Sequence, residues 1–173
     1  MHPIAPLSPA LIALTGVLSL SAAQADTADW PWWRGPNQDG VADSKQSPPL
    51  RFGEGENVIW VTDIPGRGHG SPTVVGDRVF LATADEEEKT QSLLCLNRSD
   101  GRLRWSREDH RGGFPSKSNK KASQASSTPA CDGARVYINF LHRGAVYTTA
   151  FDLNGEQQWR TKITDYVLHQ GFG

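Results

Sequence analysis

The sequence predicts an all-β chain that forms an incomplete β-propeller of four-stranded antiparallel blades. Apolar residues come in short runs separated by turns rich in Gly and Pro, of which the chain has 17 and 11. No long stretch has helical periodicity. A four-strand unit recurs at a period of about 40 to 50 residues, and one such sheet cannot bury its faces without neighbours. Together these observations favour stacked blades over a helical or mixed fold.

The first full unit covers about residues 70–106. Its strands are expected over 72–75, 78–84, 92–97 and 103–106. Gly76-Asp77 is expected to turn between the first two strands, and Asp100-Gly101 between the last two. Residues 85–89, rich in carboxylates, are expected to form a solvated turn rather than a cation site, because consecutive acidic side chains on an unconstrained tip do not converge.

The second unit covers about residues 127–161 and repeats the first position by position. Its strands are expected over 128–131, 135–141, 145–152 and 156–161. Ser71-Pro72 returns as Thr128-Pro129, and the closing Gly-x-x-x-Trp occurs in both units. An earlier, partial copy ends at Trp60. Residues 109–127, between the units, are longer than a blade connection requires, and a loop of that length is usually functional or disordered.

The N-terminal residues 1–25 have the pattern of a secretory signal peptide. An apolar run from 10 to 20 ends in Ala23-Gln24-Ala25, the small-x-small sequence that precedes cleavage. An N-terminal anchor is the alternative, but the apolar run is too short to span a bilayer. The mature chain is therefore predicted to be periplasmic or secreted, without a membrane span.

Residues 26–56 form a lead-in rich in Trp, Pro and Gly, ahead of the propeller part at 57–173. The lead-in has three large aromatic side chains close together, Trp30, Trp32 and Trp33. Exposing that much apolar area to water is unfavourable, so these side chains are expected to pack on the propeller. The alternative is a platform on which a sugar or base stacks.

The repeat resembles a known family. The pattern Ala-x-Asp-x-x-Thr-Gly-x-x-x-Trp, closing a blade that opens with Ser-Pro and a Gly-Asp turn, is similar to the pyrroloquinoline quinone (PQQ)-type repeat of quinoprotein dehydrogenases and of the outer-membrane assembly lipoprotein. This chain shows it at 95–105 and 150–159. The resemblance covers about residues 57–173.

The resemblance implies roles for the blade-end residues. The Trp would pack between neighbouring blades and the turn Gly would give it room, so a docking role is expected for Trp60, Trp105 and Trp159 with Gly101 and Gly155. Family propellers close with about seven or eight blades. The sequence is thus expected to be an N-terminal fragment whose first partners are the remaining blades.

Candidate ligand-binding residues precede each innermost strand, because the chain enters a blade there and these residues line the mouth of the central channel. They are Arg67, His69, Lys120, Lys121, Ser123, His169 and Gln170. Imidazoles and cations at one mouth suit an anionic ligand or a sugar. The alternative is that each His bonds the backbone of a neighbouring blade.

The function that these observations favour is a secreted binding or scaffold propeller without its own redox chemistry. The alternative is the N-terminal part of a PQQ-dependent quinoprotein alcohol or sugar dehydrogenase, and a third possibility is a sensor or assembly domain. Further partners would be envelope proteins or a small polar ligand. A net charge of −1 gives no field to attract nucleic acid.

No cofactor or metal is predicted; the dehydrogenase alternative would hold PQQ and calcium, and catalytic residues are not identified. The chain has no adjacent Cys pair and no Cys-x-x-Cys-His haem motif. Its two thiols, Cys95 and Cys131, are expected to be buried small residues rather than a disulfide, since Cys95 takes the place of the repeat's Ala.

Overall fold

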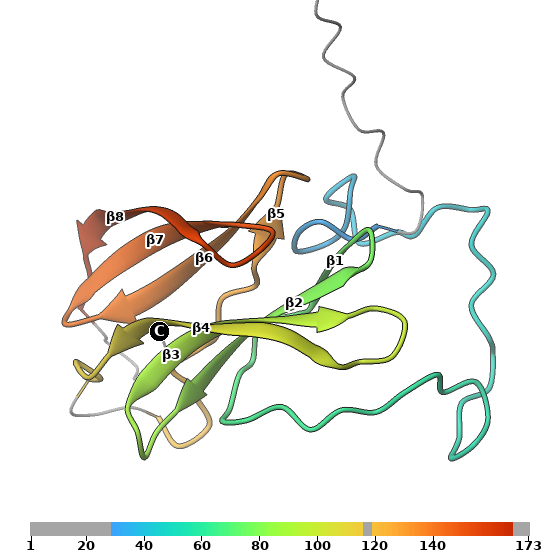
Figure 1. Cartoon of the computed structure of the whole chain (residues 1–173), viewed down its shortest axis with the longest axis horizontal. Coiled ribbons are helices and arrows are strands. Elements are labelled where there is room, and N and C mark those ends of the chain that lie inside the picture. Colours follow the sequence, from blue (N-terminus) through green and yellow to red (C-terminus); the bar gives the residue numbers. More distant parts are fainter. Residues whose placement is uncertain (1–28, 116–118, 168–173) are drawn as a thin grey trace, which may run out of the picture.

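Two four-stranded antiparallel sheets make up the described chain, which in this computed structural model comprises residues 29–115 and 119–167 (Figure 1). The predicted signal peptide and the candidates His169 and Gln170 lie outside these residues. The first sheet has the order β1 (Thr73–Val75), β2 (Arg78–Asp85), β3 (Thr90–Asn97), β4 (Leu103–Arg111); the second has β5 (Ala130–Cys131), β6 (Arg135–His142), β7 (Ala145–Asp152), β8 (Gln157–Asp165). This confirms the predicted all-β architecture of two four-stranded blades.

The fourth strand of each blade is longer than the sequence predicted. β4 continues beyond Ser106 to Arg111, and β8 beyond Thr161 to Asp165. Residues 109–111 therefore belong to a strand, and the connection between the blades begins only at Gly112. The physical reason is burial, because Asp109 and His110 are covered by the second blade.

Both blades share one irregularity next to the Trp that recurs in each copy of the repeat. Trp105 pairs with Cys95 and Trp159 with Ala150, and the register shifts immediately afterwards in both sheets. A bulge at the same place in two copies is a feature of the repeat unit, because bulges bend a strand and turn its side chains.

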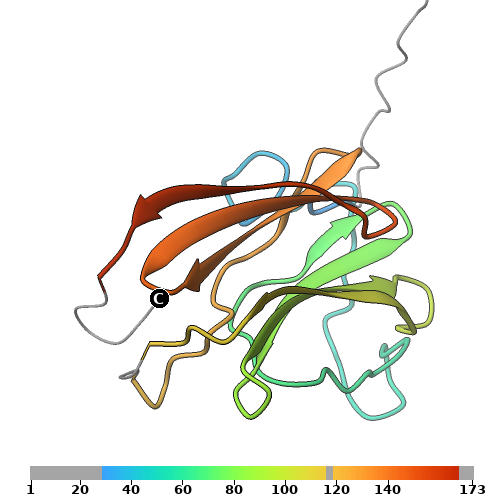
Figure 2. The same ribbon diagram turned by 60° about the vertical axis from the view of Figure 1, so that its left-hand side comes forward.

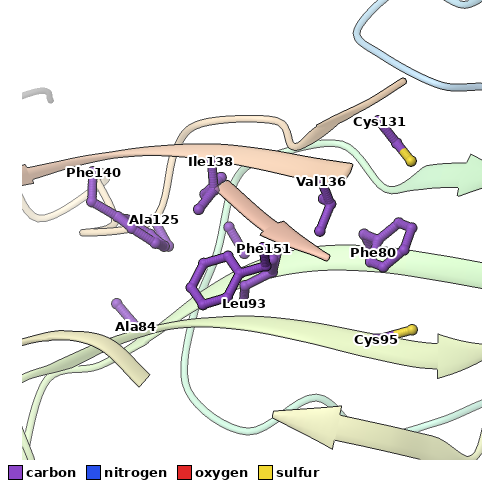
Figure 3. Close-up of a cluster of buried hydrophobic side chains, with 11 residues drawn as sticks. Phe80, Ala84, Leu93, Cys95, Ala125, Cys131, Val136, Ile138, Phe140 and Phe151 are labelled. Carbon is purple, nitrogen blue, oxygen red and sulfur yellow. The ribbon is translucent and has the colours of Figure 1, made fainter. Parts of the chain in front are cut away.

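The hydrophobic core lies between the two sheets, which stack face to face (Figure 2). Phe80 and Leu93 of the first sheet meet Val136, Ile138 and Phe151 of the second (Figure 3). Each sheet thus buries one face only by using the other, which is why neither unit would be stable alone.

Cys95 and Cys131 line this core and are both free and fully buried. They are not joined by a disulfide. Burial raises the pKa of the Cys95 thiol to about 11 and also raises that of Cys131. Both therefore stay protonated and act as small apolar side chains.

The lead-in crosses the inner edges of both blades. Trp30 exchanges two backbone hydrogen bonds with Val74 of β1, at 2.7 and 2.9 Å. The next residue, Pro31, accepts a hydrogen bond from the Cys131 amide of β5 at 2.8 Å. The expectation that all three lead-in Trp residues pack on the propeller is wrong for Trp33, which is 64% exposed. Its indole instead lies under the guanidinium of Arg34, 5.6 Å from ring centroid to Cζ.

Residues 57–64 run as an extended segment along the outer side of the first blade. Within the described residues this segment pairs with no strand. Its apolar side chains Ile59 and Val61 are 87% and 84% exposed. On the far side of the second blade, every residue of β8 is exposed. No helix capable of crossing a bilayer occurs in residues 29–115 or 119–167.

Candidate functional site

The strands have two ends with different chemistry. At one end the chain leaves the first blade at 111–115, and the β2–β3 turn at 86–89 and the β6–β7 turn at 143–144 lie at the same end. We call this the crossover end. The opposite end, near 98–102 and 153–156, is the turn end. Arg67 lies at the crossover end, where its amide and carbonyl bond those of Ala84 at 2.8 and 3.0 Å. It thereby continues the inner edge of the first blade beyond β1.

The backbone of residues 66–70 passes tightly between the two blades. A Cβ on Gly68 would lie 2.3 Å from the Ala82 carbonyl oxygen, and one on Gly70 would lie 2.2 Å from that of Ser127. Only Gly fits these positions. In an extended chain alternate residues point to opposite sides, so Arg67 and His69 point away from the strands, and both are exposed.

The second blade contributes its own cations to this end. Arg67 Nη1 donates to the Lys120 carbonyl at 3.3 Å, and the His69 amide donates to the Ala125 carbonyl at 3.0 Å. Lys120 and Lys121 are exposed. The structure thus brings the predicted candidates of the first blade next to the segment that carries those of the second.

Ser123 has a different environment from the other candidates. Its side chain is buried, and its Oγ lies 3.4 Å from Ser126 Oγ and 3.4 Å from the Ala125 amide. These contacts shape the turn that leads into the inner strand. Three exposed cations and His69 lie at the crossover end, and Arg67 shares a pocket with the acidic residues Asp85, Glu86 and Glu87. This end therefore has mixed charge and offers both donors and acceptors to a polar ligand such as a sugar.

A buried ion pair that the sequence did not reveal joins the two blades near the crossover end. The Asp109 carboxylate of β4 is fully buried, and its Oδ1 lies 2.5 Å from Arg160 Nη2 of β8. Arg160 also donates from Nε to Oδ1 at 3.1 Å and from Nη2 to the Asp109 carbonyl, while Thr149 Oγ1 donates to Oδ2 at 3.1 Å. The carboxylate is well satisfied, as a buried charge must be.

Two stacked imidazoles adjoin this ion pair. The rings of His110 and His142 are 4.4 Å apart and inclined by 14°, with Tyr147 5.2 Å from His110. Burial lowers the pKa of His110 to about 4, although Asp109 opposes the shift, and burial also lowers the pKa of His142. Both rings are therefore neutral at neutral pH, as close stacking requires.

His110 Nε2 and His142 Nδ1 are buried without a hydrogen-bond partner. In the described part of the chain, no three His, Cys, Asp or Glu side chains gather as a metal ion would need. The sequence signal for this cluster was available: residues 103–111 contain neither Gly nor Pro, so β4 had no reason to end at Ser106.

The blades dock through an indole at the turn end. Trp105 Nε1 donates to the Leu153 carbonyl of the second blade at 3.1 Å. Gly155 has φ +83°, and a Cβ there would lie 2.9 Å from the Trp105 ring. Arg107 donates from Nε to the Gly155 carbonyl at 2.8 Å, and its guanidinium lies 5.9 Å from the Trp105 ring centroid.

The same contact occurs one unit earlier. Trp60 Nε1 donates to the Arg98 carbonyl at 2.8 Å, and Thr62 Oγ1 donates to the Gly101 carbonyl at 2.9 Å. A Cβ on Gly101 would lie 2.5 Å from the Trp60 ring. Segment 57–64 therefore occupies on the first blade the place that β4 occupies on the second.

The repeated docking contact and the four-stranded units agree with the comparison of the sequence with known families. The profile of a family of PQQ-type repeats, described as outer membrane protein assembly factor BamB, matches residues 53–166. The chain belongs to this family. The match includes both blades and the segment with Trp60, so the predicted PQQ-type propeller repeat is confirmed. No curated protein matches the chain.

Proposed function

We propose that this chain is a secreted PQQ-type propeller module of the cell envelope that binds or positions other components and has no redox chemistry of its own. The family's description as an outer membrane assembly factor supports this role. The signal-peptide pattern of residues 1–25 supports delivery to the periplasm or beyond. The observation that carries the proposal is that both outer sides of the blade pair present docking surfaces.

One of these surfaces is the exposed side of β8. Trp159 occupies the position of Trp105 but is 42% exposed, and Ile163, further along the same strand, is also exposed. An exposed strand that carries the docking Trp is suited to receive another blade.

The other surface lies along segment 57–64. A pocket of about 620 Å³ opens between this segment and the first blade, with Ile59, Val74 and Leu81 among its lining residues. Segment 57–64 stands where a fourth strand stands, so a further strand would pair with its free edge by backbone hydrogen bonds. Further blades of the same propeller are the partners that these surfaces fit best.

The crossover end supplies the binding part of the proposal. Arg67, Lys120, Lys121 and His69 would recognise an anionic or polar small molecule by charge-assisted hydrogen bonds. None of these contacts requires a cofactor, and we propose that PQQ with calcium is not one.

Photocrosslinking in the cells that make the protein tests the docking surfaces. A crosslinking residue at Trp159 or Ile59 is expected to give discrete larger products in the envelope fraction, whereas one at Glu87, in an exposed turn, is expected to give none. Equal products from all three positions, or recovery of the protein in the cytoplasm, would contradict the proposal.

Equilibrium dialysis tests the chemistry. With calcium present, PQQ is expected to bind the purified chain no better than at about millimolar concentration, a weak affinity. A dissociation constant of micromolar or tighter would replace the scaffold proposal with the dehydrogenase alternative.

A further inference from the structure

The lead-in carries a second candidate binding site, farther along the inner edge of the second blade than Lys120 and Lys121. The segment is fixed on both blades. The Asp29 carboxylate accepts a hydrogen bond from the Gly76 amide at 2.9 Å, and the backbones of Trp30 and Pro31 bond β1 and β5. The loop that follows, residues 32–40, is therefore held in place beside β5 (Figure 1).

This loop has a defined shape of its own. The Gly40 amide donates to the Arg34 carbonyl at 2.9 Å, and Arg34 Nη2 donates to the Asp39 carbonyl at 3.0 Å. Arg34 and Gln38 both adopt left-handed backbone conformations, with φ of 69° and 60°. Such conformations cost free energy in residues other than Gly and occur often at binding sites.

A pocket of about 360 Å³ lies between the loop and the approach to β5. Trp32, Trp33, Arg34 and Gln38 form one wall, and residues 128–130 form the other. The volume is within the usual range for a small-molecule site. None of the residues that line it is acidic.

The lining residues offer an aromatic face together with hydrogen-bond donors. Trp33 exposes most of its indole, and the Arg34 guanidinium lies over one face of the ring, which leaves the other face for a ligand. Trp32 Nε1 is buried and has no hydrogen-bond partner, although buried donors are nearly always paired. Thr128 Oγ1 accepts from the Ser71 amide at 2.9 Å, which leaves its hydroxyl hydrogen available.

We propose that this pocket binds an acidic sugar, a pyranose that carries a carboxylate. The apolar C–H face of the sugar ring packs on the exposed indole of Trp33. Its carboxylate pairs with Arg34, and its hydroxyl groups bond the Gln38 amide and the Thr128 hydroxyl on the two walls. A neutral sugar would make the stacking contact but would leave the guanidinium without an anion.

Binding of trigalacturonate to the full chain tests the proposal, with maltotriose as the neutral counterpart. Isothermal titration calorimetry is expected to show binding of the acidic trisaccharide and at least about tenfold weaker binding of the neutral one, as expected for the loss of one charge-assisted contact.

The variants separate the aromatic contact from the charge. Trp33→Ala is expected to weaken trigalacturonate binding about tenfold or more, the size of a lost stacking contact. Trp159→Ala removes an exposed indole elsewhere and is the matched control, with no change expected. Arg34→Gln is expected to abolish the preference for the acidic sugar.

Three results would overturn the proposal. They are no binding of either trisaccharide at millimolar concentration, equal binding of both, and equal loss in Trp33→Ala and Trp159→Ala. Trp33 and Arg34 are exposed, so their replacement is expected to leave the two sheets intact, and unchanged thermal unfolding of both variants verifies that point. Arg34→Gln also loses the hydrogen bond to the Asp39 carbonyl, so retained binding of maltotriose by this variant checks the shape of the loop.

Discussion

Trp105 and Trp159 are the same residue of the repeat in two different surroundings. Each follows a Gly by four positions, each pairs with a small residue on the third strand, and each lies beside a bulge. Yet Trp105 is half-buried and hydrogen-bonded to the next blade, whereas Trp159 is 42% exposed and touches only Tyr137, at 5.9 Å, among described aromatic rings. The repeat places a Trp at this position in every unit, but the indole is buried only where a neighbouring blade covers it.

The same contrast holds for the cations of β8. Arg160 lies over the first blade and neutralises buried Asp109, whereas Lys162 is fully at the surface and pairs with exposed Asp165 at 2.6 Å. One strand thus contributes to one ion pair with a buried carboxylate and to one ion pair at the surface. Only the pair that a neighbour covers is expected to matter for stability.

The largest expected effect comes from Arg160→Leu. It leaves the Asp109 carboxylate buried without its cation, which is expected to lower the free energy of unfolding by about 3 to 5 kcal/mol. Lys162→Leu, on the same strand, is expected to change it by less than about 0.5 kcal/mol. Urea titration of both variants measures the difference, and equal losses would show that the Asp109 pair is not enclosed.

Trp105→Ala and Trp159→Ala test the comparison directly. The first removes a half-buried indole and its hydrogen bond, so the loss is expected to be about 3 kcal/mol, the lower end of the range for large aromatics. The second is expected to cost below about 1 kcal/mol while no blade covers β8. Similar losses in a denaturant titration would mean that burial does not depend on the neighbour.

The free energy of unfolding is expected to fall at acid pH, because the buried His110 ring at the contact between the blades becomes protonated on unfolding. His110 titrates with a pKa of about 4 in the folded chain and 6.5 when unfolded, so the unfolded chain binds more protons between these values. This contribution to stability is thus complete above pH 6.5 and falls as the pH drops towards 4, by about 3 kcal/mol. The charged or titratable groups facing this ring are Asp109, His142, Arg160 and Tyr147.

Thermal unfolding measured at a series of pH values from 7.5 to 4 gives the slope of stability against pH. His110→Phe removes the titrating ring and is expected to flatten it, whereas His69→Phe, at an exposed position, should leave it as in the wild type. An unchanged slope in His110→Phe would assign the acid sensitivity to other groups.

The smallest expected effect is that of the turn glycines. Gly155→Ala places a methyl group against Trp105 and forces a left-handed backbone on Ala, with an expected cost of about 2 kcal/mol. Gly76→Ala has the same backbone demand in open space and is expected to cost about 1 kcal/mol. Equal melting temperatures for the two variants would show that the indole does not need the glycine.

The sequence predicted the fold well because strand, turn and repeat signals are local. The hairpins at Gly76 and Gly101 and the family of the repeat could be identified from short patterns, and the structure and the family profile confirm them. The contacts between blades are not local. Nothing near Asp109 in the sequence shows that Arg160, on another blade, would neutralise it.

The candidate residues show the same limit. Arg67 and His69 were predicted as candidates because they precede an innermost strand, but no local pattern distinguishes exposed Lys121 from buried Ser123. The apolar area of Trp33 favours packing, yet its indole is exposed because it contacts the guanidinium of the neighbouring Arg34 instead of a blade.

The hydrogen bond from each indole to the following turn gives the stack a polarity. Trp60 reaches forward to Arg98, and Trp105 reaches forward to Leu153; the donor always belongs to the earlier unit. Surfaces that join in this way are heterologous, so a two-fold symmetric pair cannot form through them. A further unit joined through the same contact would add head to tail, and the rotation between units would decide whether the assembly closes into a ring or continues as an open fibre.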